Sequence, residues 1–183
     1  MSGKQLDFRD EREDVEARIN QVQQQRHPLC LLLDQVNNPR NLGGIFRIAD
    51  AARIEKIFGY QISEEISSKK VQRVARSTQR FVPFQNLNSI HQLEALRENY
   101  DIIALEITSE SQPFTNLEVK RPTLLIIGNE QEGVSEELLH LADRHIHIPM
   151  YGINHSYPIA ISAGIAMAEW ARRRYAGGRV VTG

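Results

Sequence analysis

The sequence predicts an α/β domain in which helices cover both faces of a mainly parallel sheet. Short apolar runs, typical of buried strands, alternate with longer segments whose apolar residues recur at helical spacing. The first run, residues 29–33, is apolar throughout, as expected of a strand that is buried on both faces. This alternation favours a parallel sheet because each parallel crossover needs a connection long enough to hold a helix.

Each element follows from the same periodicity. We expect strands at residues 29–33, 54–60, 101–107, 123–127 and 145–149, with a short extended piece at 81–84. We expect helices at residues 7–25, 42–53, 67–76, 89–99, 135–142 and 159–174. The predicted domain boundaries are an N-terminal helical extension at 1–27, the α/β domain at 28–175 and a flexible tail at 176–183.

Three of the predicted helices have features beyond their periodicity. The helix at 7–25 is polar, and its narrow apolar stripe (Val15, Ile19 and Val22) could pack on the core or on a partner subunit. Ser135 and the acidic residues after it suit the start of the helix at 135–142. The helix at 159–174 begins with small residues, which permit the close approach of another backbone, a ligand or another subunit.

Composition narrows the class of protein. The chain has 183 residues, a formal net charge of -1 and a single cysteine, Cys30, which we expect to be a buried small side chain. No run of about 18 apolar residues and no secretory segment is evident, which favours a cytoplasmic location. Bulk charge gives no support to a nucleic-acid partner, so such a partner must be argued from local clusters.

Two basic clusters interrupt this balanced charge. The first comprises Lys69, Lys70, Arg73, Arg76 and Arg80, and the second is the run at residues 172–174. A basic cluster taken alone is usually a solvated face.

Three polar loops follow predicted strands, at residues 41–47, 128–135 and 148–158. The carboxyl ends of parallel strands meet at one edge of a sheet, where ligands bind in α/β folds. The three loops therefore suggest one shared site.

The chemistry of these loops argues against a phosphate site. The loop at 128–135 carries Glu130 and Glu132 and no lysine, so it better suits a ligand with hydroxyls, an amine or a positive centre. A helix-capping turn with solvated acids is the alternative. Arg47 lies among small apolar residues, where a charged side chain tends to be paired or functional, although a surface arginine is the alternative.

Histidines offer two further readings, neither of which we favour. His145 and His147 alternate on a strand and face the same side, but no third ligand is evident, so we expect no metal site. His155 stands next to Ser156, but adjacent side chains rarely form a productive catalytic dyad, and no partnered acid is evident.

The three loops resemble the three motifs of the SpoU/TrmH branch of SPOUT RNA methyltransferases. The first reads Asn41-x-Gly43-x-x-x-Arg47-x-Ala49, the second runs from Leu125 to Ser135, and the third runs from Ile148 to Ser156. Their order and spacing match the family over residues 29–173, and the linking segments at 77–83 and 105–106 also resemble it.

The resemblance implies a SPOUT fold with a deep C-terminal trefoil knot, a rare topology. It also implies a homodimer that binds S-adenosylmethionine and methylates a ribose 2'-hydroxyl of tRNA or rRNA. The implied cofactor-binding residues are Leu105, Glu106, Ile127, Gly128, Asn129, Gly133, Ile148, Pro149, Met150, Ser156, Pro158 and Ala163.

The resemblance also assigns catalytic and RNA-binding residues. Asn41, Arg47, Glu130 and Ser156 are the implied catalytic set. A guanidinium keeps its proton in proteins, so we expect Arg47 to clamp substrate phosphate and stabilise alkoxide charge, and the proton acceptor stays open. The expected RNA-binding residues are Arg40, Lys69, Lys70, Arg73, Arg76 and Arg80, with further contacts from residues 172–174.

The sequence departs from the family at one motif position. Pro158 stands where the family has asparagine, which removes an amide donor and acceptor although proline suits the first turn of a helix. This departure motivates one alternative, a non-catalytic RNA-binding dimer with the same fold. A small-molecule α/β enzyme that uses another nucleotide is a second alternative. A separate N-terminal RNA-recognition domain, common in relatives, is not evident in the sequence.

Overall fold

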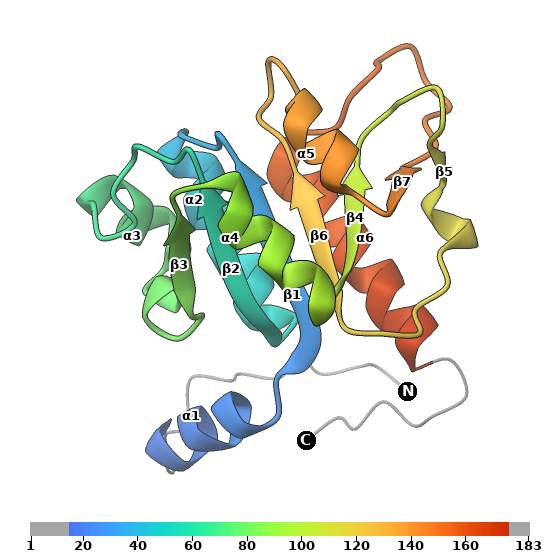
Figure 1. The fold of residues 1–183 in the computed structure, drawn as a ribbon. Coiled ribbons are helices and arrows are strands. Elements are labelled where there is room, and N and C mark those ends of the chain that lie inside the picture. The colour runs from blue at the N-terminus through green and yellow to red at the C-terminus, as the bar shows by residue number, and fades with distance from the viewer. Residues whose placement is uncertain (1–14, 176–183) are drawn as a thin grey trace, which may run out of the picture.

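The computed structural model describes residues 15–175, which form a seven-stranded sheet in the order β3-β2-β1-β6-β4-β7-β5 (Figure 1). Every strand pair in it is parallel. The strands are β1 (His27–Asp34), β2 (Ile54–Tyr60), β3 (Phe84–Leu87), β4 (Asp101–Leu105), β5 (Gln112–Pro113), β6 (Thr123–Ile127) and β7 (Arg144–His147). The helices are α1 (Val15–Gln24), α2 (Pro39–Ala51), α3 (Lys69–Ala75), α4 (Ile90–Glu94), α5 (Glu136–Leu141) and α6 (Ile159–Arg174), with 3-10 turns at Thr78–Arg80, Ala95–Glu98 and Phe114–Asn116.

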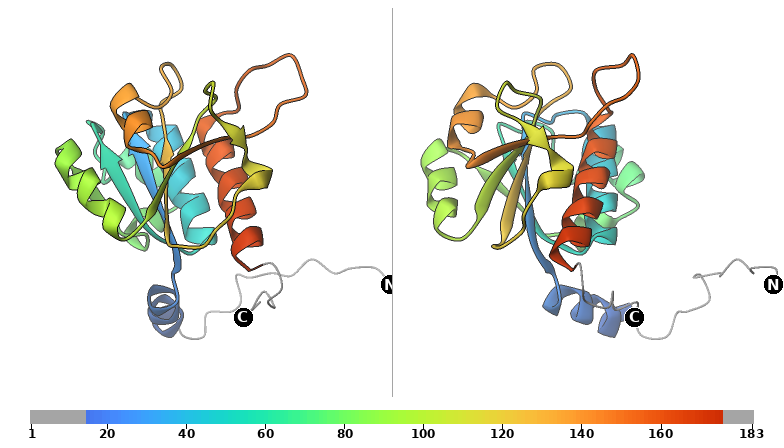
Figure 2. Two further views of the ribbon diagram at one scale, coloured as in Figure 1. Left: turned by 45° about the vertical axis from the view of Figure 1, so that its right-hand side comes forward. Right: turned by 90° about the vertical axis from the view of Figure 1, so that its right-hand side faces the viewer.

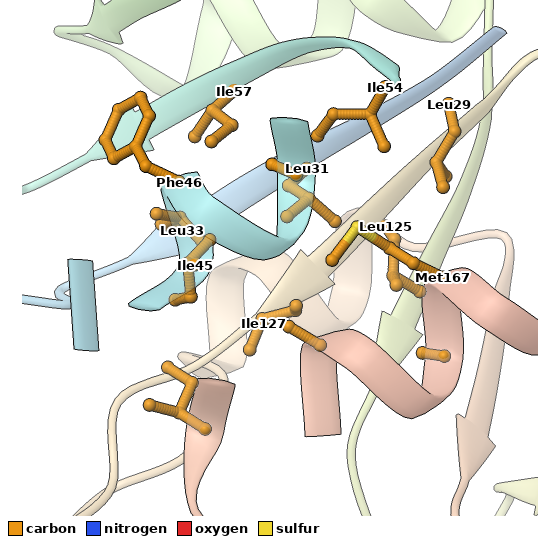
Figure 3. Packing of buried hydrophobic residues seen from close by; sticks show 14 of the residues in the cluster. Leu29, Leu31, Leu33, Ile45, Phe46, Ile54, Ile57, Leu125, Ile127 and Met167 are labelled. Carbon is orange, nitrogen blue, oxygen red and sulfur yellow. The ribbon is translucent and has the colours of Figure 1, made fainter. Parts of the chain in front are cut away.

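Helices cover both faces of the sheet, as the sequence predicts. Helices α2, α3 and α6 pack on one face, and α4 and α5 pack on the other (Figure 2). Each face has its own apolar cluster, and Figure 3 shows the one beneath α2 and α6. The predicted α/β class with a parallel sheet is therefore confirmed.

Strand β1 shows how the sequence produces this two-sided core. Leu29, Leu31 and Leu33 face the α2 and α6 side, whereas Cys30 and Leu32 face the α4 and α5 side. Side chains alternate along a strand, so a strand buried on both faces must be apolar at every position. Strand β6 is buried along its whole length in the same way, which makes β1 and β6 the centre of the fold.

The lone cysteine is a core residue, as predicted. Cys30 is fully buried, and burial raises the pKa of its thiol to about 12. The thiol therefore stays protonated and unreactive at neutral pH.

No helix in the described part of the chain is long and apolar enough to cross a membrane.

Helix α2 begins three residues earlier than the expected 42–53 and ends at Ala51. Pro39 occupies its first turn, and the side chain of Asn38 caps it by accepting from the Arg40 backbone N–H at 2.9 Å. Proline suits that position because its missing N–H has no partner within the helix. Apolar periodicity alone does not detect this polar first turn.

Other boundaries differ where local geometry overrides periodicity. The helix expected at 89–99 is the short α4 followed by a 3-10 turn, and the extended piece expected at 81–84 is displaced to β3 at Phe84–Leu87. Strand β5 lies in a segment expected to be a loop. Strands β4 and β7 end two residues before the predicted 107 and 149. The helix predicted at 7–25 is present as α1 over Val15–Gln24, and its first part at 7–14 and the tail at 176–183 lie outside the described residues.

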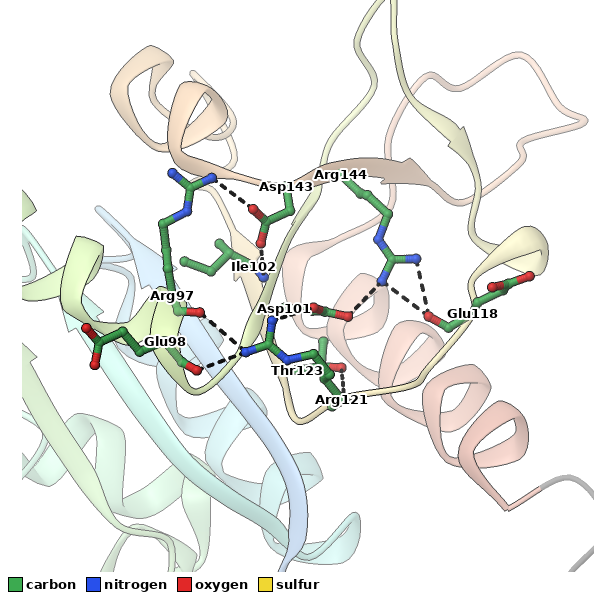
Figure 4. Close-up of polar contacts among 9 residues, drawn as sticks. All are labelled: Arg97, Glu98, Asp101, Ile102, Glu118, Arg121, Thr123, Asp143 and Arg144. Carbon is green, nitrogen blue, oxygen red and sulfur yellow. Dashed lines mark hydrogen bonds and ion pairs between the residues drawn. The ribbon is translucent and has the colours of Figure 1, made fainter.

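Polar side chains tie the amino-terminal edge of the sheet together (Figure 4). The carboxylate of Asp143 accepts from the Ile102 backbone N–H at 2.9 Å and from the Arg97 guanidinium at 2.8 Å. Burial alone would raise the pKa of Asp143, but these two donors lower it. Arg144 bonds Asp101 and the Glu118 carbonyl nearby, so the starts of β4 and β7 are held in register.

Glycines in α2 allow three helices to pack closely. A Cβ placed on Gly43 would lie 2.6 Å from the Cβ of Val74 and 2.9 Å from the carbonyl oxygen of Val71, both in α3. A Cβ on Gly44 would lie 3.2 Å from Ala160 in α6. These two glycines therefore allow α3 and α6 to pack closely against α2.

We predict that Gly43→Ala lowers the free energy of unfolding by about 1–3 kcal/mol, because the added methyl must push α3 away from α2. Gly152→Ala is the matched control, since no atom lies within 4 Å of its ideal Cβ and its stability should be unchanged. Urea denaturation of the two variants checks this, and equal effects would contradict the packing role of Gly43.

Candidate active site

A cleft of about 770 Å³ opens at the carboxyl edge of the sheet. The loops after β4, β6 and β7 form it, together with the first turn of α6, and these loops lie at one edge of the molecule (Figure 1). Its lining residues are Leu105, Glu106, Ile107, Ile127, Gly128, Asn129, Glu130, Gln131, Glu132, Gly133, His147, Ile148, Met150, Asn154, His155, Ser156, Tyr157, Pro158, Ile159 and Ser162.

Two of the three predicted motif loops meet in this cleft. Ten of the twelve expected cofactor-binding residues line it, as do the expected catalytic residues Glu130 and Ser156. Pro149 is not a lining residue, and Ala163 is fully buried in the core beneath α6. Ser162 lines the cleft from the same helix, and Ala163, one position later, faces the core.

The loop at 128–135 folds back on itself in a shape that requires glycine at two positions. A Cβ on Gly128 would lie 1.9 Å from the carbonyl carbon of Gly133, because the loop folds back on itself there. Asn129 stabilises this turn through its side-chain oxygen, which accepts from the backbone N–H groups of Gln131 at 2.8 Å and Glu132 at 2.9 Å. Gly133 has a φ of +70°, a conformation that glycine adopts without strain.

The charge of the cleft is negative. Glu106, Glu130 and Glu132 line it, and none of the lining residues is lysine or arginine. Glu130 and Glu132 are exposed and form no ion pair within the described chain, so their charges act on whatever occupies the cleft. This arrangement disfavours an anionic ligand and favours one with a positive centre or hydroxyl groups.

Sequence reasoning did not identify several lining residues. Asn154, His155 and Tyr157 lie in the third motif loop but not at the motif positions that carried the prediction, and Ile107 follows β4. His147 also lines the cleft, and its Nδ1 hydrogen-bonds the Ser111 hydroxyl at 2.9 Å. The sequence shows only that these residues lie in loops after strands. Such a place does not tell which side chains of a loop line the cleft and which point into solvent.

His145 and His147 lie on β7, between β4 and β5, and each bonds a hydroxyl of the loop between those two strands. His145 Nδ1 contacts the Thr108 hydroxyl at 3.0 Å, and its Nε2 contacts the Leu139 carbonyl at 3.0 Å. Both ring nitrogens of His145 are therefore used, one in a hydrogen bond to the loop between β4 and β5 and the other in a hydrogen bond to α5.

Pro158 fits the start of α6, where the family asparagine would stand. Its carbonyl accepts from the backbone N–H groups of Ile161 at 2.8 Å and Ser162 at 3.0 Å. Pro158 is the N-cap residue of the helix. A backbone N–H at this position would have no partner within the helix, so proline costs the helix no hydrogen bond. The helix therefore forms as expected, and Pro158 itself lines the cleft.

The first motif lies beside the cleft rather than in it. Arg47 and Asn41 are both on α2, and neither is a lining residue. Gly43 faces α3 and Gly44 faces α6. Arg47 lies about one helical turn after both, so it is on the same side of α2 as these two glycines. Its exposed side chain therefore emerges between α3 and α6, and it forms no hydrogen bond or ion pair with the described residues.

The first basic cluster is free to contact a polyanion. Its members, Lys69, Lys70, Arg73, Arg76 and Arg80, are all exposed, as is Arg40 on α2, and none of these six forms an ion pair with the described residues. They come from α2, α3 and the 3-10 turn after α3, which pack against one another.

The second basic cluster is partly neutralised. Arg172 and Arg173 both bond the carboxylate of Glu169, at 2.7 Å and 2.6 Å. These hydrogen bonds, that from Arg172 first, lower the pKa of Glu169 to about 2. The sequence run at 172–174 therefore overstates the free positive charge at the end of α6.

The amino-acid sequence is similar to those of known RNA methyltransferases. The chain matches the profile of the SpoU rRNA Methylase family over residues 28–168. It is 30% identical over 160 residues to a tRNA (guanosine(18)-2'-O)-methyltransferase of Aquifex aeolicus, across 86% of this chain and 75% of that one.

Solved structures agree with the profile. The A. aeolicus TrmH/SpoU tRNA modifying enzyme superposes with a TM-score of 0.77 and 28% identity, over 87% of this chain and 83% of that one. An AdoMet-bound rRNA methyltransferase from Sinorhizobium meliloti superposes with a TM-score of 0.76 and 28% identity, over 85% of this chain and 60% of that one. With its parallel sheet and its cleft built from two of the three motif loops, this chain belongs to the SpoU rRNA methylase family.

Proposed function

We propose that this chain transfers a methyl group from S-adenosylmethionine to a ribose 2'-hydroxyl of tRNA or rRNA. The observation that carries the proposal is a cleft lined by three glutamates and no lysine or arginine, together with exposed cations on α2 and α3 that form no ion pair with the described residues. A sulfonium ligand suits the first, and an RNA backbone suits the second. The relatives named above, which act on tRNA and rRNA, support this substrate class.

The residues of the cleft fit the cofactor. The folded-back loop at 128–133 and the residues Ile148 and Met150 offer backbone groups and apolar surface, while Glu130 offers a negative charge near a sulfonium. When bound, S-adenosylmethionine supplies an electrophilic methyl group. The chain's own residues bind and orient the reactants there, which is the main contribution of a protein to such a reaction.

Arg47 acts on the RNA side of the site. Its exposed guanidinium, without a partner in the described chain, is available to a phosphate next to the target ribose. It would also stabilise negative charge that develops on the 2'-oxygen. A guanidinium stays protonated at neutral pH, so the proton of the hydroxyl must go to another acceptor.

A homodimer completes the site in this proposal. Tyr151 is 96% exposed and Ile153 is 93% exposed, on the loop that borders the cleft, and Ile161 is half exposed on the first turn of α6. A second copy that covers these apolar side chains would bring its own α2 and Arg47 toward the cleft. The family resemblance adds the trefoil knot to this arrangement, and modification of tRNA or rRNA agrees with a cytoplasmic location.

We predict that Arg47→Ala lowers kcat for RNA methylation by about 100-fold or more, as expected when a donor to developing oxyanion charge is removed. The KM for S-adenosylmethionine should change little, because Arg47 does not line the cleft of its own chain and, in the proposed dimer, acts on the RNA. Transfer of tritium from labelled S-adenosylmethionine to bulk RNA measures both. Lys120→Ala, at an exposed pair with Glu118 far from the carboxyl edge, is the control. Undiminished methylation by Arg47→Ala would remove Arg47 from the mechanism.

We predict that Lys69→Ala with Lys70→Ala weakens RNA binding similarly for all sequences and reduces the slope of log K against log salt by about 0.7–0.9 per lost phosphate contact. Arg172→Ala is the matched control, because Glu169 already neutralises that guanidinium. Filter binding at several salt concentrations checks this. A larger loss for Arg172→Ala would relocate the RNA surface to α6.

A further inference from the structure

A carboxylate is buried at the carboxyl end of β1, where the rest of the core strand is apolar. Asp34 is 0% exposed, and its Oδ2 accepts from the Ser135 backbone N–H at 2.7 Å. Its Oδ1 has no partner within the described chain. An ionised carboxylate is expensive to bury, and an apolar side chain would cost less at this position. We therefore look for the role of Asp34 in its hydrogen bond to Ser135.

A second carboxylate holds the preceding amide of the same loop. The Oε2 atom of Glu106 accepts from the Val134 backbone N–H at 3.0 Å, and its Oε1 accepts from the Ile107 backbone N–H at 2.9 Å. The backbone at Gly133 passes so close to this carboxylate that a Cβ there would lie 2.4 Å from Oε2. Glu106 therefore grips the loop as well as lining the cleft.

The sheet order explains why two carboxylates meet on one loop. Strand β6 lies between β1 and β4, so its following loop passes between the ends of both neighbours. Asp34 comes from one neighbour and Glu106 from the other, and they hold the consecutive amides of Ser135 and Val134. Charge-assisted hydrogen bonds of this kind are stronger than neutral ones. We call this arrangement, Asp34 and Glu106 on residues 134–135, the carboxylate clamp.

Two unpartnered atoms lie within the clamp. Asp34 Oδ1 and Ser135 Oγ are both buried without a hydrogen bond inside the described chain, although their residues are already joined. A rotation of the Ser135 side chain that brings its hydroxyl to Oδ1 would satisfy both atoms together. Buried polar groups that lack partners are costly, so this second bond would tighten the clamp.

We propose that Asp34 is a positioning residue, which with Glu106 fixes the shape of the loop at 128–135 and so sets the affinity for the cofactor. The inference rests on the proposed methyl transfer, since it takes S-adenosylmethionine as the ligand of the cleft. Asp34 itself does not line the cleft, so its effect must pass through the loop.

Titration calorimetry with S-adenosylhomocysteine tests the clamp on the full chain. Asp34→Ala removes both acceptors and should raise Kd about tenfold or more, the effect of losing a hydrogen bond to a charged group. Asp34→Asn keeps an oxygen for the Ser135 N–H, so it should restore Kd to within about threefold of the unmodified protein. The KM for RNA should not change in either variant, because the exposed cations lie on α2 and α3.

Thr123→Val is the matched control for lost stability. Thr123 is buried at the opposite end of β6, where its hydroxyl accepts from Trp170 Nε1 at 2.9 Å. This variant should lower Tm and leave Kd unchanged. If Asp34→Ala binds as tightly as the unmodified protein, or if Thr123→Val raises Kd equally, the clamp does not position the loop.

Amide exchange on the unmodified protein provides a test that needs no variant. The clamp predicts that the Ser135 and Val134 amides are protected before any ligand is added, and rapid exchange at Ser135 would overturn it whether or not Asp34→Ala folds. Failure of the unmodified protein to bind S-adenosylhomocysteine would instead contradict the proposed function.

Discussion

The structure depends on the burial of β1 and β6 on both faces by two layers of helices. Both strands carry apolar side chains at nearly every position, and each alternates its side chains between the α2 and α6 cluster and the α4 and α5 cluster. Parallel strands that pair in this way must end at a common edge. The loops after β6 and its neighbours are thereby brought together, which is the condition for a site built from residues far apart in the sequence.

Charge is divided between the cleft and the surface of α2 and α3. The cleft carries glutamates without a lysine or arginine among its lining residues, while cations that form no ion pair in the described part of the chain project from α2, α3 and the turn after α3. This division explains how a chain with a net charge of -1 can be suited to RNA. Whether a surface attracts a polyanion depends on where the charges lie, and not only on the net charge of the chain.

Much of the fold was predictable because its main elements carry clear periodicity. The strands at 54–60 and 123–127 and the helix at 159–174 have the predicted bounds. The edge strands β3 and β5 were displaced or missed because strands this short show no period, and Pro113 in β5 argues against a strand. The start of α2 was missed because a polar cap and a proline, not apolar residues, define it.

The site was predictable in its motifs but not in its hydrogen bonds. Spacing located the loop at 128–135, yet nothing in the sequence pairs Asp34 with Ser135, which are 101 residues apart. Ala163 lies on the buried face of α6, whereas Ser162, one position earlier, lines the cleft, and the motif spacing alone does not separate these two faces. The partial neutralisation of residues 172–174 depends on Glu169, which precedes them by one helical turn.

The most direct test of the central claim is mass spectrometry of nucleosides from tRNA and rRNA that have been incubated with the protein and S-adenosylmethionine. A ribose 2'-O-methylated nucleoside should appear only when both the protein and the cofactor are present. A methyl group on a base, or no methylated nucleoside with either RNA, would contradict the assignment of this cleft to ribose methylation.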